Sequence, residues 1–474
     1  MAAAILQLSE IIASSVARLL SICEEQQLAL PQLDEPYTCG SETFRQNSAA
    51  AEAASLIGAA ALQLAATLLP PQETLLQAAS GSMKSAALSA CTNYHLPEIL
   101  RREGGSQGIH VDAIASKSGL DKDKTGRLLR LLANRHIFRE VSPNVFANNR
   151  ISSLLDTCKD PAHLISSPTS KHDDTSGFVA LVEMLLTDGL RSAAYLVDNL
   201  RDPHTSASME PQHAALQRAY KLDVRFSEWM QQPDQEYRRR RLTSALDGVA
   251  SVESKDYILK AYNWSSVPHG GKVVDVGGGI GAIALSLNRA HPELKLIIED
   301  RAEVIADGIK ARLCLWQEKR PSALASGQVQ FIAHDFFGPQ PRNILSPSVF
   351  ILRNVLHKLG DQEAIRLLTF LRASAGICTV LLILGHVMPS SLHDGRSMSS
   401  SDVPSPLLPD YGAADDTTYT VDMAMLLWYN SQVRTINHLS HLLEESGWRM
   451  KFVQRNERFQ GGKSALDVVH ASPS

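Results

Sequence analysis

From residue 271 to the C-terminus, short apolar segments alternate with stretches whose apolar residues have helical spacing. The apolar segments read KVVDV, LKLIIE, VQFIAHD, SVFILRNV, TVLLILGHV, WRMKFV and ALDVVHA. Runs this short and this apolar are typical of strands covered on both faces, and their alternation with helices favours an open, mainly parallel sheet. We therefore predict an α/β domain over residues 261–474, with a mostly parallel seven-stranded sheet between two layers of helices.

The length and charge of the chain limit what else it contains and what it binds. Its 474 residues are enough for about two to three domains. Lys and Arg total 46 against 50 Asp and Glu, so the formal net charge is −4. Without a basic surplus we expect neither nucleic acid nor a membrane surface as a partner, and a small molecule fits this composition better.

Six cysteines lie far apart in the sequence, without a CxxC pair or a Cys/His cluster: Cys23, Cys39, Cys91, Cys158, Cys314 and Cys378. This pattern predicts no structural zinc site, and we expect no other metal. Dispersed cysteines are typical of a reduced intracellular protein, so we expect a cytoplasmic location. The N-terminus has no basic segment and reaches Glu10 early, which argues against a signal peptide.

Residues 1–90 are predicted to form a helical N-terminal extension, with helices over residues 1–30 and 48–68. The most apolar run of the chain, residues 53–69, is rich in alanine and interrupted by polar residues. We therefore expect a packed helix and not a membrane span. Apolar helices at one end of a chain usually need a partner surface, which in a homodimer is the second subunit.

Residues 91–160 have the pattern of a winged helix-turn-helix. A helix from residue 111, a turn at Gly119, a helix over residues 123–135 and a two-strand wing over residues 138–145 follow in order. Such a module either reads DNA or holds a dimer together. Acidic residues alternate with the basic residues of the second helix, so phosphate neutralisation would be poor and we favour dimerisation.

A helical connecting region is predicted over residues 161–260. Within it Phe226, Trp229 and Met230 share one helical face; core packing is the favoured explanation, and an aromatic substrate pocket is the alternative. A later segment, residues 389–417, is rich in Ser, Asp and Pro and is predicted to be a mobile surface insert in the α/β domain.

The segment VVDVGGGIG, residues 273–281, ends a predicted strand in a glycine-rich turn. Gly277, Gly278 and Gly279 allow a sharp backbone turn at the start of the next helix, and Asp300 ends the second strand, where an acid accepts hydrogen bonds from a ribose. The glycine spacing is G-x-G-x-G and not the G-x-G-x-x-G of dinucleotide sites, which favours S-adenosylmethionine, since no pyrophosphate has to be bound.

From about residue 90 the chain resembles the S-adenosylmethionine-dependent O-methyltransferases of the plant caffeate and flavonoid type, in their fungal form. The matching segments are VVDVGGGIG, HDFFGPQP (334–341), FILRNVLHKLGD (350–361) and DMAML (422–426). The family joins a winged-helix dimerisation domain to a Rossmann-like methyltransferase domain. The resemblance therefore implies a homodimer that binds S-adenosyl-L-methionine and a small-molecule acceptor, in secondary metabolism.

The resemblance also implies roles for individual residues. The cofactor-binding positions are Gly277, Gly278, Gly279, Asp300, Asp335, Phe336 and Arg353. Among them, Gly277 lies under the methionine part, Asp300 holds the ribose, and the residues of HDFF contact the adenine. His357 matches the general base that removes the proton of a substrate hydroxyl, and Met425 matches a position beside the aromatic ring of the acceptor.

The surroundings of His357 depart from the family pattern. In the family an acid follows the base and two further acids flank it, whereas here Lys358 follows His357, and Gly385 and Val433 occupy the two flanking positions. Loss of carboxylates removes the groups that raise the basicity of a histidine, and an inward-pointing Lys358 would lower its pKa further. Proton abstraction should weaken, while cofactor binding should remain.

Three functions are compatible with this pattern. The first is an O-methyltransferase that acts on an acidic hydroxyl or a carboxylate, where proximity supplies most of the rate. The second is an enzyme that keeps S-adenosylmethionine as an electrostatic element and catalyses a dehydration or a pericyclic rearrangement, with Lys358 donating to a substrate carbonyl. The third is a DNA-binding or regulatory protein whose active part is the winged helix.

Overall fold

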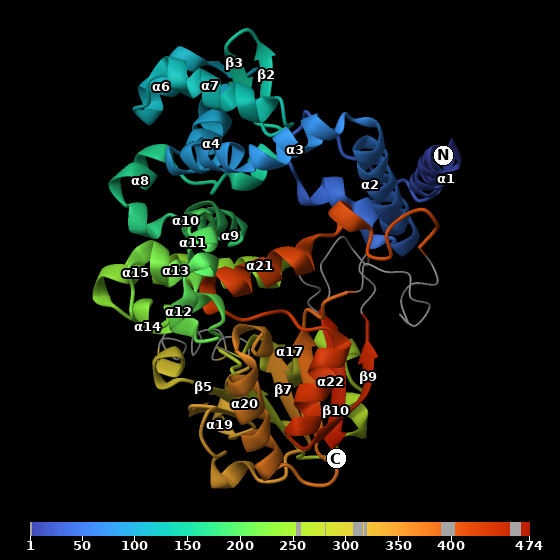
Figure 1. Cartoon of the computed structure of the whole chain (residues 1–474), viewed down its shortest axis with the longest axis vertical. Helices are drawn as coiled ribbons and strands as arrows, with labels where there is room; N and C mark the ends of the chain where they lie inside the picture. Colours follow the sequence, from blue (N-terminus) through green and yellow to red (C-terminus); the bar gives the residue numbers. More distant parts are fainter. Residues whose placement is uncertain are drawn as a thin grey trace.

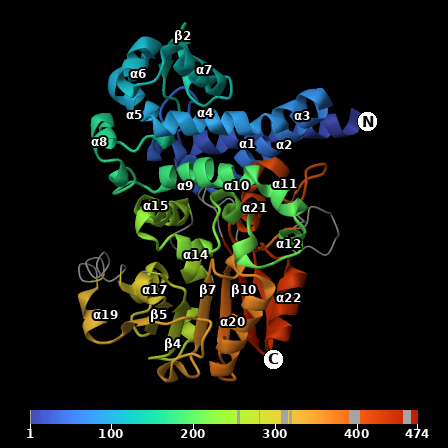
Figure 2. The ribbon, with the colours of Figure 1, turned by 60° about the vertical axis from the view of Figure 1, so that its left-hand side comes forward.

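The computed structural model arranges the chain in three tiers (Figure 1). It describes residues 2–252, 257–279, 281–306, 316, 320–389, 403–455 and 466–474. A winged-helix module lies at one end of the molecule, the large sheet lies at the other, and a layer of helices separates them (Figures 1 and 2).

Seven strands form the large sheet in the order β6-β5-β4-β7-β8-β10-β9. The strands are β4 (Lys272–Val276), β5 (Lys295–Asp300), β6 (Val329–Ala333), β7 (Val349–Arg353), β8 (Val380–Gly385), β9 (Trp448–Gln454) and β10 (Asp467–Pro473). β10 runs antiparallel to both of its neighbours, and the other pairs are parallel. The predicted Rossmann-like, mostly parallel sheet is confirmed. Its strand order reverses between β4 and β7, the point at which such sheets bind ligands.

Helices cover both faces of the sheet, because successive strand residues point to opposite sides. Val273 packs on one side with Ile283 of α17, and Val274 packs on the other with Leu367 of α20. The first face carries α16 (Tyr257–Lys260), α17 (Ala282–Ala290) and α19 (Pro321–Ala325). The second face carries α20 (Asp361–Ser374) and α22 (Ile436–Glu445).

The winged-helix module contains the predicted helices and wing strands, preceded by two further helices and a short strand. Its elements are α4 (Gly81–Asn93), α5 (Leu96–Ile99), β1 (Ile109–His110), α6 (Val111–Ser118), α7 (Lys122–Ala133), β2 (Arg139–Ser142) and β3 (Val145–Ala147). The Asp121 carboxylate caps α7 by accepting a hydrogen bond from the Lys124 amide at 3.0 Å. The two-residue strand β1 was not predicted; it pairs with β3 and completes a sheet of order β1-β3-β2.

The N-terminal extension consists of α1 (Ala2–Glu25), α2 (Ser48–Leu68) and α3 (Pro71–Ala79), with α1 packed along α2. Segment 389–417 was predicted to be a mobile insert; residues 390–402 lie outside the described residues. The remainder is not a free loop, because Leu407 is 1% exposed in a small core with Leu8 of α1 and Ala60 of α2. The Gln63 side chain also donates to the Pro406 carbonyl oxygen at 2.9 Å.

Helices α1 and α2 each contain a window that is long and apolar enough to cross a membrane, judged by length and composition. Packed helices of soluble proteins pass the same test. In the single chain most of this apolar surface is exposed, and the exposed leucines of α1 to α3 include Leu6, Leu20, Leu62, Leu68, Leu75 and Leu76. This surface therefore needs a partner.

The middle tier contains the connecting helices and one helix of the C-terminal half. These are α8 (Pro161–Ser166), α9 (Phe178–Met184), α10 (Leu190–Ala194), α11 (Leu196–Arg201), α12 (Pro203–Ser206), α13 (Ala215–Tyr220), α14 (Phe226–Trp229), α15 (Glu236–Val252) and α21 (Thr417–Tyr429). Buried Lys171 ties this tier to the winged helix, since its ammonium donates to Glu183 at 2.6 Å and to the Thr92 carbonyl oxygen at 2.9 Å.

Candidate active site

The glycine loop follows β4 at the carboxyl edge of the sheet. The Gly277 and Gly278 amides both donate hydrogen bonds to the Glu299 carbonyl oxygen of β5, at 2.8 and 3.1 Å. Gly277 has a φ of +72°, and a Cβ at this position would lie 3.1 Å from Val355 Cγ2 and 3.9 Å from Phe336 Cε1. A side chain here would fill the space between the loop and these two neighbours.

Asp275 lies directly beneath the loop. A Cβ on Gly278 would lie 2.6 Å from the carboxyl carbon of Asp275, so only glycine fits at that position. Asp275 is 4% exposed, and burial raises its pKa to about 7 although the Arg353 guanidinium opposes this shift. The nearby Asp300 charge raises the pKa further. The loop therefore rests on a carboxyl group that is only partly ionised at neutral pH.

Asp300 ends β5 and turns toward the glycine loop. Its Oδ2 accepts a hydrogen bond from the Gly279 amide at 2.9 Å, and its Oδ1 accepts one from the Arg301 amide at 2.8 Å. Each carboxylate oxygen has a further lone pair, so the group can still accept hydrogen bonds from two hydroxyls of a ribose. Asp300 is thus fixed in place without being saturated.

The other predicted cofactor residues lie at the same edge. Asp335 follows β6 and accepts a hydrogen bond from the Phe337 amide at 3.0 Å, and the neighbouring Phe336 ring borders Gly277. Arg353 ends β7, with its guanidinium 5.7 Å from the centre of the Tyr257 ring. The structure therefore brings all the predicted cofactor positions to the carboxyl ends of β4 to β7.

This edge fits S-adenosylmethionine. A Cβ on Gly279, which has a φ of +58°, would meet no atom within 4 Å, so the outer side of the loop is open to a ligand. Asp300 supplies acceptors for ribose hydroxyls, and Phe336 supplies an aromatic face for a purine. Among the described residues, no group of three or more His, Cys, Asp or Glu could hold a metal ion.

His357 lies in a single 3-10 turn, η10 (Leu356–Lys358), which begins three residues after β7 ends. The turn is held from behind by hydrogen bonds to its backbone. The Ser431 hydroxyl donates to the His357 carbonyl oxygen at 2.7 Å, and the buried Arg434 guanidinium donates to two further carbonyl oxygens of this segment, both at 2.7 Å. Asp361 binds the same guanidinium at 2.8 Å. The backbone that carries His357 is therefore rigidly placed.

The environment of His357 makes it a weak base. Burial holds the pKa of His357 well below its ordinary value, and the positive charges of Lys358, His386 and Arg434 lower it further. Among the residues that the structure describes, no carboxylate raises this pKa. The imidazole is therefore neutral at pH 7, and the imidazolium formed on accepting a proton would be poorly stabilised.

Lys358 is adjacent to His357 in sequence but responds to a different set of charges. Burial lowers the pKa of its ammonium, the Asp300 carboxylate raises it, and the Arg353 and Arg301 guanidiniums lower it. Asp300 and Arg353 end β5 and β7 beside the glycine loop, and Arg301 follows Asp300. The charges that shift the pKa of the Lys358 ammonium are therefore those of the cofactor edge. Its contact with the acceptor stays a prediction.

Position 385, where the family resemblance leads us to expect an acid, faces the imidazole. A Cβ on Gly385 would lie 3.9 Å from His357 Nδ1 and 3.9 Å from Asn354 Oδ1. At the second flanking position Val433 is buried, and its amide donates to Asp422 Oδ1 at 2.6 Å. Asp422 is thereby engaged by the backbone of the segment that would otherwise carry the second acid.

Phe226, Trp229 and Met230 lie in the hydrophobic core of the middle tier. Their side chains are 6%, 3% and 4% exposed, and the Phe226 ring centre is 6.4 Å from that of Trp428 and 5.4 Å from that of Tyr429. This arrangement corresponds to the core-packing explanation. Their contact with an acceptor stays a prediction.

Helix α21 brings Met425 and Tyr429 to the tier above the sheet. Met425 is buried, while Tyr429, one turn later on the same helix face, is half-buried. Burial raises the pKa of the Tyr429 hydroxyl, and the Arg301 guanidinium opposes this shift. We did not predict Tyr429; its spacing of four residues from Met425 was the available signal.

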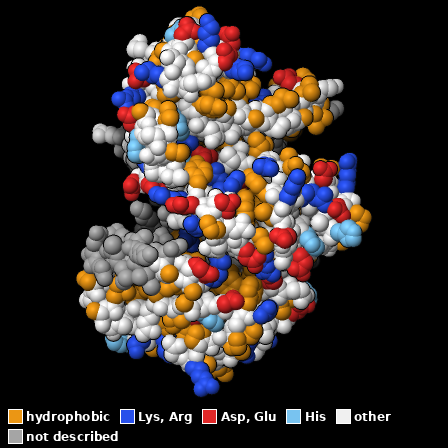
Figure 3. All heavy atoms as spheres, turned by 90° about the vertical axis from the view of Figure 1, so that its left-hand side faces the viewer, with side chains coloured by type: hydrophobic (Ala, Val, Ile, Leu, Met, Phe, Trp, Pro, Cys, Tyr) orange, Lys and Arg blue, Asp and Glu red, His pale blue; other side chains and the backbone are white. Residues whose placement is uncertain are grey.

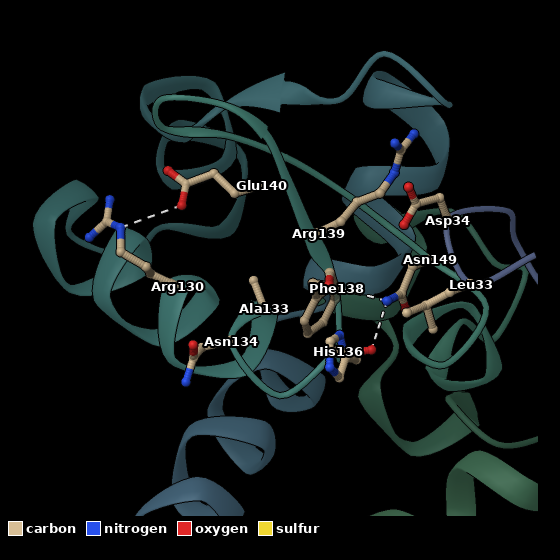
Figure 4. A pocket seen from close by; sticks show the side chains of 10 residues that line it. All are labelled: Leu33, Asp34, Arg130, Ala133, Asn134, His136, Phe138, Arg139, Glu140 and Asn149. Atoms are coloured by element: carbon tan, nitrogen blue, oxygen red, sulfur yellow. Dashed lines mark hydrogen bonds and ion pairs between the residues drawn. The ribbon is translucent and has the colours of Figure 1, made fainter. Parts of the chain in front are cut away.

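A hollow of about 380 Å³ lies far from the predicted site residues, between the loop after α1 and the winged helix (Figure 4). On one side Asn149 donates to the carbonyl oxygens of His136 and Phe138 at 2.7 and 3.2 Å, and on another Arg130 pairs with Glu140 at 3.6 Å. Its lining has mixed charge and contains none of the predicted site residues.

Basic residues of the winged helix are paired with acids of the same module. Lys122 lies 3.9 Å from Asp112, and Lys117 lies 3.2 Å from Glu103. Figure 3 shows side chains of both charges intermixed over this end of the molecule on the face drawn. Duplex binding requires a net basic face, so these pairs support the expectation of no nucleic-acid partner. That expectation stays a prediction.

A glycine loop after the first strand of the sheet, an acid after the second, an aromatic residue after the third and a histidine after the fourth define a class of protein. They are the parts of a class I S-adenosylmethionine-dependent methyltransferase, here preceded by a winged helix.

Comparison with known proteins specifies the family. Residues 205–402 match the model of the O-methyltransferase domain, and residues 76–157 match that of the O-methyltransferase dimerisation domain. An O-methyltransferase of Armillaria gallica is 39% identical over 94% of each chain. The 4-O-methyltransferase 1 of Phanerochaete chrysosporium is 38% identical over 99% of each chain.

Solved structures agree on the fold. Mitomycin 7-O-methyltransferase MmcR is 20% identical, with a TM-score of 0.63 over 85% of this chain and 98% of that chain. LepI, solved in complex with S-adenosylmethionine, is 15% identical, with a TM-score of 0.66 over 98% of this chain and all of that chain. At these identities the likeness shows the fold alone.

The chain belongs to the S-adenosylmethionine-dependent O-methyltransferase family. Its cofactor is S-adenosyl-L-methionine, and it is an O-methyltransferase of secondary metabolism, similar to the two fungal relatives named above. The dimerisation-domain match supports a homodimer.

Proposed function

We propose that this methyltransferase acts on an acidic hydroxyl, or a carboxylate, of an aromatic or polyketide-like small molecule, with His357 as the general base. The observation that carries the proposal is the charge around the imidazole: Lys358, His386 and Arg434 all lower the pKa of His357. A base of this kind removes a proton efficiently only from an acceptor that releases it readily. Its relative named 4-O-methyltransferase 1 supports transfer to oxygen.

The cofactor half of the site has assigned roles in this proposal. Asp300 accepts hydrogen bonds from the ribose, Gly277 lies under the methionine part, and Asp335, Phe336 and Arg353 contact the remainder. When bound, S-adenosylmethionine supplies a methyl group on a positively charged sulfur. Lys358 joins this half, because its ammonium lies within the electrostatic reach of Asp300.

In the base half, the two nitrogens of His357 have different tasks. Nδ1 faces position 385, so Nε2 is the atom directed to the acceptor. The acceptor hydroxyl would pass its proton to Nε2, and the imidazole would become an imidazolium. The bound cofactor would supply the methyl group, and its sulfur would keep the electron pair of the carbon–sulfur bond that breaks. The surrounding cations disfavour that imidazolium, which is why a phenol with an electron-withdrawing substituent should react faster than a plain phenol.

The acceptor ring is proposed to bind between the sheet edge and α21. Met425 and Tyr429 supply its wall, and Phe226, Trp229 and Met230 support that wall from behind. Aromatic and thioether side chains favour flat, apolar ligands.

The test supplies purified protein with S-adenosylmethionine and a graded series of phenols, from plain ones to ones with a carbonyl group para to the hydroxyl. We expect S-adenosylhomocysteine and a methyl ether in equal amounts, with kcat/KM highest for the acidic members. Rates that are equal across the series would contradict the acidic-acceptor proposal. A converted acceptor without any S-adenosylhomocysteine would show instead that the cofactor acts only electrostatically.

We further propose that the exposed leucines of α1 to α3 are covered by the second subunit of the dimer and not by a membrane. Leu75 and Leu76 are each about 70% exposed on α3, next to the matched dimerisation domain. Changing both to Glu should convert a dimer into a monomer in light scattering. A membrane contact would instead appear as vesicle binding by the unchanged protein.

A further inference from the structure

We propose that Asn354, acting through one water molecule, positions His357 in place of the acid that is missing at position 385. The inference rests on the proposed role of His357 as the base. It assigns Asn354 as a positioning residue and assigns the cavity beside Gly385 to a bound water.

The backbone of Asn354 is fixed next to the base. Asn354 follows the last residue of β7, and its amide donates to the Leu384 carbonyl oxygen of β8 at 2.9 Å. Its φ of +53° lies in the left-handed region, which asparagine tolerates better than most residues because its short side chain bonds locally. Its side-chain oxygen Oδ1 is buried and has no hydrogen-bond partner among the described residues. A buried carbonyl oxygen of this kind requires a donor.

A small cavity connects this oxygen to the base. Its volume is about 30 Å³, above the roughly 10–15 Å³ that one water needs. The residues that supply polar groups or open space to it are Asn354, His357, Gly385, His386 and Arg434. The point where a Cβ of Gly385 would stand is 3.9 Å from His357 Nδ1 and 3.9 Å from Asn354 Oδ1. The glycine thus leaves room between two groups that need a shared partner.

The proposed water lies in this cavity between the two side chains, where it accepts a hydrogen bond from His357 Nδ1–H and donates one to Asn354 Oδ1. This pairing selects the tautomer with a proton on Nδ1 and leaves Nε2 as the free base. The charged or titratable groups that act on the imidazole are Lys358, His386 and Arg434. None of them is a carboxylate that could accept the hydrogen bond from Nδ1–H. Because asparagine is neutral, the bridge orients the imidazole without raising its basicity, which an acid would do.

The experiment compares four variants with the unchanged protein. Asn354→Gly removes the acceptor while tolerating the left-handed backbone, and Asn354→Asp keeps an acceptor of the same size. Gly385→Ala adds a methyl group at ordinary contact distance and displaces the water. Ser431→Ala is the matched control, because Ser431 binds the His357 carbonyl oxygen and not its ring.

The first readout is the tautomer of His357 in cofactor-free protein, from long-range proton–nitrogen spectra of protein labelled on histidine. The second is the pH dependence of kcat and kcat/KM, together with the affinity for S-adenosylhomocysteine. The tautomer readout does not require catalysis, so it still tests the bridge if His357 is not the base.

We expect a proton on Nδ1 in the unchanged protein, in Asn354→Asp and in Ser431→Ala. Asn354→Gly and Gly385→Ala should lose this preference and about tenfold in kcat, with cofactor affinity unchanged. The double variant should lose no more than either single one, because both remove the same bridge. Asn354→Asp should move the acid limb of the pH profile to higher pH. An unchanged tautomer in Asn354→Gly, or additive losses in the double variant, would overturn the proposal.

Discussion

The two halves of the site differ in how their charges are balanced. In the cofactor half, Asp300 is held by two backbone amides, and the Gly277 and Gly278 amides share one carbonyl acceptor. In the base half, His357 stands among cations, and a glycine occupies the position that faces its Nδ1. The first half therefore has the partners that its ligand requires, whereas the second lacks the partner that would strengthen its base.

This difference separates binding from proton transfer. In the proposed assignment, cofactor binding depends on backbone geometry and the Asp300 carboxylate, which are both present. The rate of proton removal depends instead on the electrostatic environment of the His357 ring. Hydrogen bonds to the backbone of the turn that contains His357 fix the position of this residue, although the charges around its ring make it a weak base. Variants in the cofactor half should consequently leave the rate of proton removal unchanged, and variants in the base half should leave the cofactor affinity unchanged.

The largest effect is expected from Asp300→Ala. Loss of about two hydrogen bonds to a charged group, each worth roughly 1.5–3 kcal/mol, should weaken binding of S-adenosylhomocysteine roughly 1000-fold, since each 1.4 kcal/mol or so is tenfold. Titration calorimetry measures this affinity. Asp300→Asn is the matched control and should lose less, because one acceptor oxygen remains. An affinity within tenfold of the unchanged protein would show that Asp300 does not hold the ribose.

His357→Ala should lower kcat at least ~100-fold, because general-base catalysis contributes roughly that much or more. The affinity for S-adenosylhomocysteine should stay within about twofold, since His357 belongs to the other half. Single-turnover rates and calorimetry on the same protein check both statements. An unchanged rate would show that His357 is not the base, and a large loss of affinity would show that the halves are not independent.

Gly385→Asp should convert the base half toward a stronger base. A carboxylate built from a Cβ 3.9 Å from His357 Nδ1 would reach hydrogen-bond distance and raise the pKa of the imidazole. Since the active form is the neutral ring, a higher pKa moves the acid limb of the rate profile to higher pH. Above that limb we expect about a tenfold gain on plain phenols.

Gly385→Asn is the control for this gain, because it fills the same space without charge. It should leave the acid limb where the unchanged protein has it. Both variants should lose about 1–3 kcal/mol in free energy of unfolding from crowding the small cavity, which denaturant titration measures. A gain in Gly385→Asn equal to that in Gly385→Asp would exclude an electrostatic cause.

The fold was predictable because its signals are local. Seven apolar runs, the glycine loop and the caps and turns of the winged helix each occupy a few consecutive residues, and the structure has them at those places. The position of residues 403–417 was not predictable in the same way. Leu407 reaches a core formed by helices about 350 to 400 residues earlier in the chain, and a Pro- and Asp-rich segment carries no local sign of such a contact.

The site was predictable in its list of residues but not in how they face each other. The sequence shows that position 385 lacks an acid, yet it does not show that the resulting space also borders Asn354 Oδ1. Tyr429 was missed because it lies outside the DMAML segment, and only its spacing of four residues from Met425 indicated it. Neighbouring residues of a tight turn point in different directions, so the sequence does not show which charges act on the Lys358 ammonium.

The smallest effect is expected where the two halves meet, at Lys358→Met. Removal of this ammonium takes away a cation that lowers the pKa of His357, so that pKa should rise and the acid limb should move to higher pH. The gain in basicity should raise the plateau rate by no more than about threefold. Because the Asp300 carboxylate also acts on Lys358, the affinity for S-adenosylhomocysteine should change as well, by a similar factor.

The pH profile and calorimetry of Lys358→Met measure both changes, with Lys358→Arg as the control that keeps the charge. A shift in the pH profile without a change in affinity would assign Lys358 to the base half alone, whereas the reverse would assign it to the cofactor half alone.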